Sequence, residues 1–168
     1  MAIASLYKYR HVSILFIFVI INGFYYWFRG ILGVDDTERF LKSAQLLLEG
    51  DLFQSHDFWY ITYCSFLGLL LKIGCYSPEV VVCIQLLVSL SATYALFFAA
   101  SNFFKNEIYG FVTVGLNFLF LKMYTWNFFV LTEAFYCSFI CFFLYTLSKY
   151  YSLKPVSYTH LRAHETRG

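Results

Sequence analysis

Three carboxylates stand at the ends of apolar runs, where they could do chemistry beside a membrane. Asp35 and Asp36 follow the first long apolar run, and Glu133 opens the last one. A carboxylate can take the proton of a hydroxyl acceptor as a general base, and it can stabilise positive charge developing on a sugar carbon. The alternative is helix capping, because Asp35 and Glu38 have the spacing of a capping box. Capping explains Asp35 and leaves Asp36 free, so Asp36 is the stronger catalytic candidate.

The polar interval after Asp36 predicts a short amphipathic helix. Apolar side chains recur there with helical spacing, at Phe40, Ala44, Leu47 and Leu48. Gly50 then ends the pattern, as a glycine commonly does just past a helix. Such a helix lies on a membrane surface and would hold Asp36 at its N-terminal end.

Composition assigns the chain to the integral membrane proteins. Apolar residues make up 60% and charged residues 13%, against roughly 45–50% and about 25% in soluble domains. The aromatic share of 23% suits lipid-facing helices with interfacial rings. The net charge of +2 comes with scattered basic residues, so we expect membrane lipids and no nucleic acid as partners.

The apolar runs predict an all-α, polytopic transmembrane helix bundle with about four spans and one amphipathic interfacial helix. The predicted spans are Val12 to Phe28, Val80 to Phe104, Ile108 to Leu121 and Phe135 to Leu147. Lys8 and Arg10 precede the first span, which places the N-terminus in the cytoplasm by the positive-inside rule. Polar residues of the second span, Gln85 and Ser89 among them, are expected to join helices by hydrogen bonds.

The run from Phe58 to Ile73 is just too short to cross a bilayer, so the sequence allows two topologies for it, an interfacial placement and a full crossing. If it lies in or dips into the outer interface, Lys105, Lys149 and Lys154 are all cytoplasmic, which agrees with the positive-inside rule. A full crossing would move those lysines outside. The interfacial placement is favoured, and it brings Asp35, Asp36 and Glu133 to the same outer face.

Two stretches resemble a known family. They are DTERFLKSAQLLLEG, which begins at Asp36, and FVLTEAFYCSFICFFLY, which contains Glu133. They are similar to the first outer loop and a later span of the polytopic glycosyltransferases that use lipid-phosphate sugars, such as the protein O-mannosyltransferases and the aminoarabinose transferases of lipid A. Where many relatives carry an Asp-Glu pair, this chain has Asp36 and Thr37.

The resemblance implies an enzyme that transfers a sugar from a polyprenyl-phosphate donor to a hydroxyl of a glycan, lipid or protein, with inversion, on the outer or lumenal face. Asp36 and Glu133 would be the catalytic acids of such a site. Asp35, His56, Asp57 and Lys122 are the candidates for contacts with substrate. The metal ligands are not identified, and a divalent metal is compatible with such a site.

Residues 1–155 are expected to form the N-terminal part of a transmembrane glycosyltransferase domain, in a bacterial-type inner or plasma membrane. The string VSYTHLRAHETRG, residues 156–168, is polar and aperiodic and resembles translated sequencing-adapter sequence. We expect this tail to be non-native, disordered and dispensable. The chain is therefore expected to be truncated and to be inactive as it stands.

A different class of function has the same hydropathy. In a transporter fragment or a non-catalytic membrane subunit, Asp36 and Glu133 would mark an ion path or only cap helices. Transporters place charged or helix-breaking residues near the middle of the bilayer. This sequence keeps its acids at the outer boundary and predicts no paired broken helices, which favours the enzyme.

Overall fold

The computed structural model describes residues 9–33, 35–51 and 60–153. Nearly all of these residues are helical, and no strand occurs in the described ranges beyond one isolated bridge between Leu32 and Phe129. The elements are α2 (Arg10–Arg29), α3 (Asp35–Glu49), α4 (Ile61–Lys72), α5 (Pro78–Phe104), α6 (Glu107–Leu119), α7 (Leu121–Thr125), the 3-10 helix η2 (Trp126–Phe128) and α8 (Glu133–Leu153). The all-α prediction is confirmed for this part of the chain.

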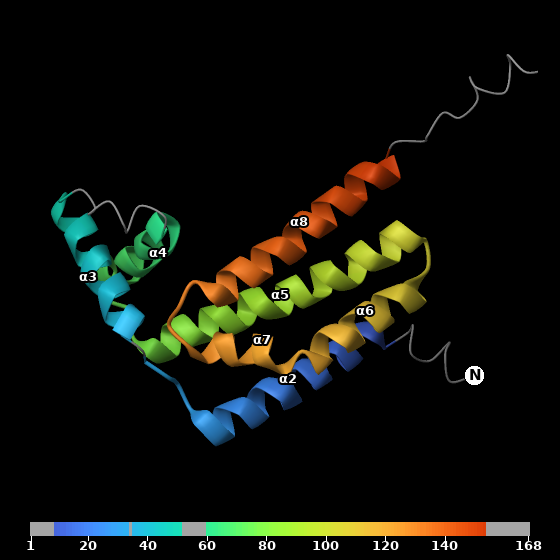
Figure 1. Ribbon diagram of the computed structural model, residues 1–168, viewed down its shortest axis with the longest axis horizontal. Helices are drawn as coiled ribbons and strands as arrows, with labels where there is room; N and C mark the ends of the chain where they lie inside the picture. The colour runs from blue at the N-terminus through green and yellow to red at the C-terminus, as the bar shows by residue number, and fades with distance from the viewer. Residues whose placement is uncertain (1–8, 34, 52–59, 154–168) are drawn as a thin grey trace, which may run out of the picture.

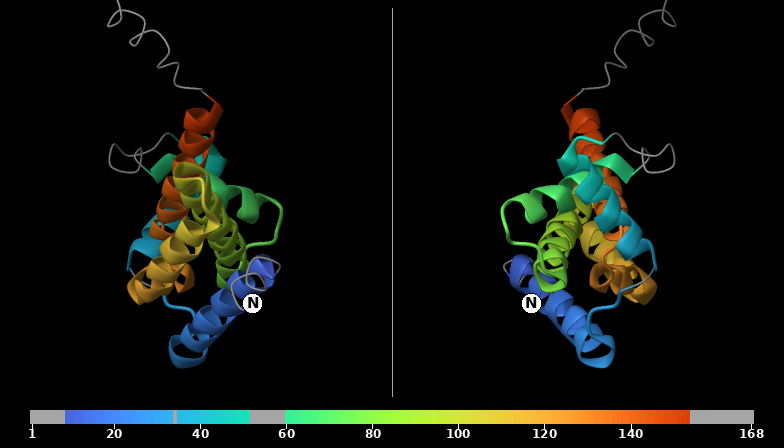
Figure 2. Two further views of the ribbon diagram at one scale, coloured as in Figure 1. Left: turned by 90° about the vertical axis from the view of Figure 1, so that its right-hand side faces the viewer. Right: turned by 90° about the vertical axis from the view of Figure 1, so that its left-hand side faces the viewer.

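Helix α5 is the central element of the bundle (Figure 1). Helix α8 packs along α5, and α6 folds back against α5 from the C-terminal end of that helix. Helix α2 makes fewer contacts and stays on the outside of the bundle, as the views along the long axis show (Figure 2). The pair α3 and α4 packs together at one end, close to the start of α5.

Local sequence signals fix both ends of α5. Ser77 accepts a hydrogen bond from the backbone N–H of Val80, and Pro78 takes the first helical position, where its missing N–H costs nothing. At the other end Lys105 adopts a left-handed conformation with φ 52°, and Asn106 caps α6 by accepting from Ile108. The tight α5–α6 hairpin follows from these consecutive caps.

Among the described residues, two helices are long and apolar enough to cross a membrane, namely α2 and α5. Helix α6 and the segment Leu121–Phe128 would make a third span, although they meet at an angle of 68°. Helix α8 has 21 residues but falls short of the same apolarity criterion. The membrane assignment therefore stands at two or three spans by length and composition, rather than the four that the sequence suggests.

The predicted span from Ile108 to Leu121 corresponds to α6, which ends at Leu119, and the chain then bends at Phe120. Phe120 leaves the helical region with ψ 63°, and the following turn directs Tyr124 back to donate a hydrogen bond to Asn117. The buried ring of Tyr124 packs against Phe18 and Phe118. Burying this ring favours the bend over continuation of α6.

Helix α4 has 12 residues, about 18 Å of helix, which is too short for a bilayer crossing. This length agrees with the interfacial placement preferred from the charges. Helix α3 packs on it through the predicted apolar face, where Phe40 and Ala44 are buried. Gly68 lets α4 approach the backbone of Ala44, since a Cβ there would lie 3.4 Å from the Ala44 carbonyl oxygen.

The two ends of the bundle differ in charge. One end carries the acids Asp35, Asp36, Glu38, Glu79 and Glu133, which outnumber the cations Arg29 and Arg39 beside them, and is called the acidic end below. The opposite end, called the basic end, carries Arg10, Lys105 and Lys149 around Glu107. Helices α2, α5 and α8 each run from one end to the other (Figure 1). The structure thus brings Asp35, Asp36 and Glu133 to one end of the molecule, as predicted.

Candidate functional site

A large cavity opens at the acidic end between α4 and the start of α8. Its volume is about 530 Å³. Aromatic rings make up most of its wall, and Glu133 is its one carboxylate. The lining residues are Tyr60, Thr62, Tyr63, Phe66, Thr132, Glu133, Phe135, Tyr136 and Phe139. We refer to it as the Glu133 cavity.

Glu133 is the first residue of α8, where the helix dipole favours a negative charge. One of its carboxylate oxygens accepts a 3.3 Å hydrogen bond from the hydroxyl of Thr132. Burial raises the pKa of the Tyr63 hydroxyl in the same wall, and electrostatic repulsion from Tyr76 and Glu133 adds to the effect. Tyr63 therefore keeps its proton, which it donates to the side-chain oxygen of Gln85 at 3.2 Å.

Asp36 is not among the residues that line this cavity. Its side chain is 56% exposed and forms a 3.2 Å ion pair with Arg39, one turn along α3. The guanidinium of Arg39 stands 5.1 Å from the ring centre of Phe40 and 5.6 Å from that of Tyr60. Because Tyr60 lines the Glu133 cavity, Arg39 links Asp36 to its wall.

Two contacts hold the start of α3 against the segment that leads into Glu133. The hydroxyl of Thr37 donates to the carbonyl of Val130 at 3.2 Å, and the N–H of Leu32 donates to the carbonyl of Phe128 at 2.9 Å. Thr37 is buried, which gives a structural role to the residue where many relatives in the resembled family have glutamate. Asp36 and Glu133 are therefore positioned by adjoining segments.

Asp35 was predicted to cap α3 from the position before its first helical residue, but α3 starts one residue earlier than that prediction requires. Helix α3 begins at Asp35 itself, so Asp35 shares the first turn with Asp36 and Glu38, and the cap position falls on residue 34, outside the described residues. Three acids in one first turn complement the positive end of the helix dipole. Asp35 is exposed and is not among the residues that line the Glu133 cavity.

The other predicted substrate contacts are His56, Asp57 and Lys122. His56 and Asp57 lie outside the described residues. Lys122 is exposed on α7, just past the bend at Phe120, and does not line the Glu133 cavity. Within the described ranges, no group of three His, Cys, Asp or Glu side chains could hold a metal ion.

An apolar groove between α5 and α8 adjoins the Glu133 cavity. A second hollow of about 310 Å³ shares Phe135 and Phe139 with it and extends toward the basic end. Its lining residues are Ile84, Leu87, Val88, Ser91, Phe135, Phe139 and Phe142. The groove is nearly devoid of polar groups, so it suits a hydrocarbon chain.

A buried polar network supports the wall of the site from behind. The amide of Gln85 donates to the carbonyls of Asn127 and Phe129, and Asn127 donates to Asn22 and Ser89. This network ties α2, α5 and the segment before α8 together, and it confirms the linking role predicted for Gln85 and Ser89. Asn22 and Asn127 were not predicted, although lone asparagines inside apolar runs are a usable signal.

The site as a whole combines an exposed carboxylate–guanidinium pair beside Tyr60, an aromatic cavity that contains Glu133, and an adjoining apolar groove. Comparisons with protein-family models, with curated proteins and with solved structures find no match for the chain. What the site does is therefore argued from its geometry and from the chemistry of its residues.

Proposed function

We propose that the chain belongs to an integral membrane glycosyltransferase that moves a sugar from a polyprenyl-phosphate donor to a hydroxyl acceptor at the outer face of the membrane. The observation that carries the proposal is the junction at the acidic end. There Asp36 and Arg39, called the acidic rim below, meet Tyr60 in the wall of the Glu133 cavity, and the groove between α5 and α8 shares Phe135 and Phe139 with that cavity. A lipid-phosphate sugar has the same sequence of polar head, anionic linker and apolar tail.

Each part of the proposed donor has a complementary group. The apolar groove receives the polyprenyl chain, whose tail carries no group that needs a hydrogen bond. Arg39 is a planar cation suited to a phosphate and can exchange the carboxylate of Asp36 for it. The Glu133 cavity, with several hydroxyl groups in its wall, receives the sugar.

The reaction needs one base. As the acceptor oxygen bonds to the anomeric carbon, the bond from that carbon to the phosphate oxygen breaks, and the configuration inverts. The acceptor's proton passes to the carboxylate of Asp36, while the lipid phosphate leaves as an anion with the bonding electron pair. Glu133 is the second acid, placed to orient sugar hydroxyls or to stabilise positive charge on the sugar ring.

A donor-specific assay tests the proposal. Membranes from cells that express the complete gene should transfer labelled sugar from a polyprenyl-phosphate donor and not from a nucleotide sugar. Ser91→Trp, which fills the groove from an exposed position on α5, should raise KM for the lipid donor. Ser152→Trp, on the exposed end of α8, is the matched control and should change nothing. Equal use of both donors would contradict the proposal.

One observation favours transport as the second candidate. The α6–α7 bend breaks a membrane-length helix, and broken helices line substrate sites in secondary transporters. The acids, however, lie at one end of the bundle and not beside the bend. Uptake into proteoliposomes that depends on residues near Phe120, without any sugar transfer, would select the transporter.

A further inference from the structure

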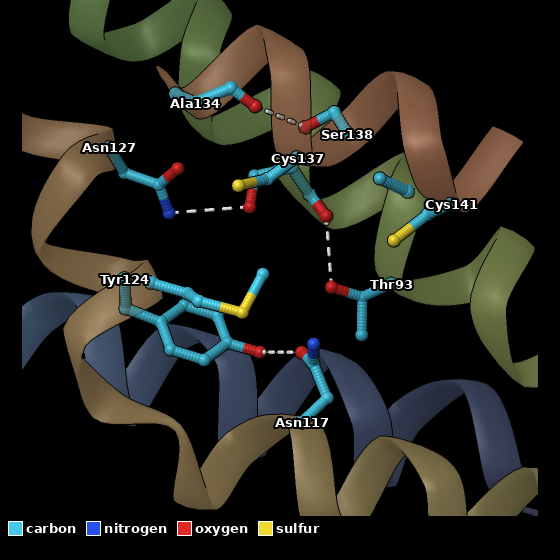
Figure 3. A pocket seen from close by; sticks show the side chains of 11 residues that line it. Thr93, Asn117, Tyr124, Asn127, Ala134, Cys137, Ser138 and Cys141 are labelled. Atoms are coloured by element: carbon cyan, nitrogen blue, oxygen red, sulfur yellow. Dashed lines mark hydrogen bonds between the residues drawn. The ribbon is translucent and has the colours of Figure 1, made fainter.

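A small polar cavity lies inside the bundle where α6 gives way to α7, away from the Glu133 cavity. Its volume is about 30 Å³, enough for one or two water molecules. Side chains from α5, α6, α7 and α8 converge on it (Figure 3). The lining residues are Ser89, Ala92, Thr93, Asn117, Met123, Tyr124, Asn127, Ala134, Cys137, Ser138 and Cys141.

Three hydroxyl groups in the wall give their protons to other partners. Thr93 donates to the carbonyl of Ser89 at 2.9 Å, Ser138 donates to the carbonyl of Ala134 at 2.7 Å, and Tyr124 donates to the side-chain oxygen of Asn117. Figure 3 draws these bonds along the edge of the cavity. Each oxygen keeps lone pairs with which it can accept a further hydrogen bond.

Asn117 supplies the opposite kind of group. Its side-chain oxygen is used by Tyr124, and in Figure 3 its amide nitrogen lies on the cavity side, between Tyr124 and Thr93. Among the described residues, this NH₂ group donates to no acceptor. The wall therefore offers several acceptors together with one donor.

We infer that this cavity binds an ordered water molecule that links α5, α6 and α7 across the bend. Water matches the wall because it accepts from the Asn117 amide and donates its two protons to the hydroxyl oxygens of Thr93 and Tyr124. A sodium ion matches it poorly, because the Asn117 N–H groups would repel it and no carboxylate lines the cavity. The bound water stabilises the broken helix by giving the Asn117 amide an acceptor beside the bend.

A double-mutant cycle on the purified protein in detergent tests this inference. Thr93→Val and Asn117→Leu should each lower the thermal unfolding midpoint, and the double variant should lose less than the sum of the two single losses, since the same water is lost in every case. Thr146→Val and Ser152→Ala are controls, because these exposed hydroxyls also bond a backbone carbonyl of their own helix, three residues earlier, without a cavity. The control effects should be small and additive. Additive losses for Thr93 and Asn117 would overturn the shared water.

A density map at a resolution that shows ordered water provides the second test and needs no variant. It should contain a peak at hydrogen-bonding distance, about 2.7–3.2 Å, from Asn117 Nδ2 and from at least one of the Thr93 and Tyr124 hydroxyl oxygens. A map that resolves these side chains and shows no peak there would refute the inference, even if the variants failed to fold.

Discussion

The two ion pairs of the described residues lie at opposite ends of the bundle and differ in what they join. At the basic end, Arg10 contacts Glu107 at 2.6 Å and so connects α2 to the start of α6, 97 residues away in the chain. At the acidic end, Asp36 and Arg39 belong to the same helix, one turn apart at 3.2 Å. The first pair fixes the position of a helix, while the second fixes only a side chain.

This difference separates Glu107, a carboxylate that holds the fold together, from Asp36, a carboxylate that is available to a substrate. Glu107 cannot leave Arg10 without loosening α2, which has few other contacts in the bundle. Asp36 can exchange Arg39 for a substrate group at little cost to the fold. Substitutions in the interior and at the basic end should therefore lower stability, and substitutions at the acidic rim should leave it almost unchanged.

The largest loss of stability is expected for Asn127→Leu. Asn127 is 2% exposed and donates to Asn22 and Ser89, so leucine removes both bonds and leaves buried acceptors without partners. We expect a loss of about 3 kcal/mol in the free energy of unfolding, measured by denaturant titration in micelles. A loss of stability as small as that expected for a variant of Asp36 or Arg39 would contradict the proposed difference between the interior and the acidic rim.

A somewhat smaller loss is expected for Gly110→Ala in the α5–α6 hairpin. A Cβ there would lie 2.8 Å from the carbonyl oxygen of Phe97, so the two helices must separate, at a cost of about 2 kcal/mol. Gly115→Ala, also in α6, is the control because its Cβ meets nothing within 4 Å. The control should raise stability by about 0.5 kcal/mol through helix propensity. Equal effects at both glycines would show that the hairpin is not tightly packed.

Glu107→Gln should lower the free energy of unfolding by about 1 kcal/mol by weakening the Arg10–Glu107 pair. The loss is modest because the pair is partly exposed and the glutamine amide still accepts a hydrogen bond. Glu79→Gln, an exposed acid in the first turn of α5, is the comparison and should lose less, because it gives up only local interactions at the helix start. Moderate salt screens the ion pair, so it should lower the stability of the wild type toward that of Glu107→Gln. If Glu107→Gln lost no more stability than Glu79→Gln, the contrast between the two pairs would disappear.

The smallest effect on stability is expected for Arg39→Gln at the acidic rim, below about 0.5 kcal/mol, because the pair with Asp36 is exposed and local. The same variant should raise KM for the lipid-phosphate donor by removing the cation proposed to hold its phosphate. A large loss of stability with an unchanged KM would show that Arg39 has a structural role and does not bind the donor phosphate.

Local signals predicted the elements that carry the acids. The spacing of Phe40 and Ala44 predicted the helix after Asp36, and the charge distribution placed Asp36 and Glu133 at the same end. The short run before Ile73 was correctly separated from the helices of membrane length. These features depend on residues close together in the sequence, or on one charge rule applied to the whole chain.

Features set by tertiary contacts were not predictable in this way. The bend at Phe120 has no glycine or proline to signal it and depends on Tyr124 reaching Asn117 and packing on Phe18. The placing of Arg39 over Tyr60 needs α3 and α4 to meet across a loop. Both arise from partners that sequence spacing alone does not identify.

The most direct test of the account compares Asp36→Asn with Asp35→Asn in a sugar-transfer assay with a polyprenyl-phosphate donor, at matched expression of the complete gene. Both acids are exposed in the first turn of α3, so the two variants should have the same stability. Asp36→Asn keeps the shape of the side chain but removes the base, and should lower kcat by about 10²–10⁴. Asp35→Asn should retain nearly full activity. Full activity in Asp36→Asn, with or without loss in Asp35→Asn, would contradict the assignment of Asp36 as the catalytic base.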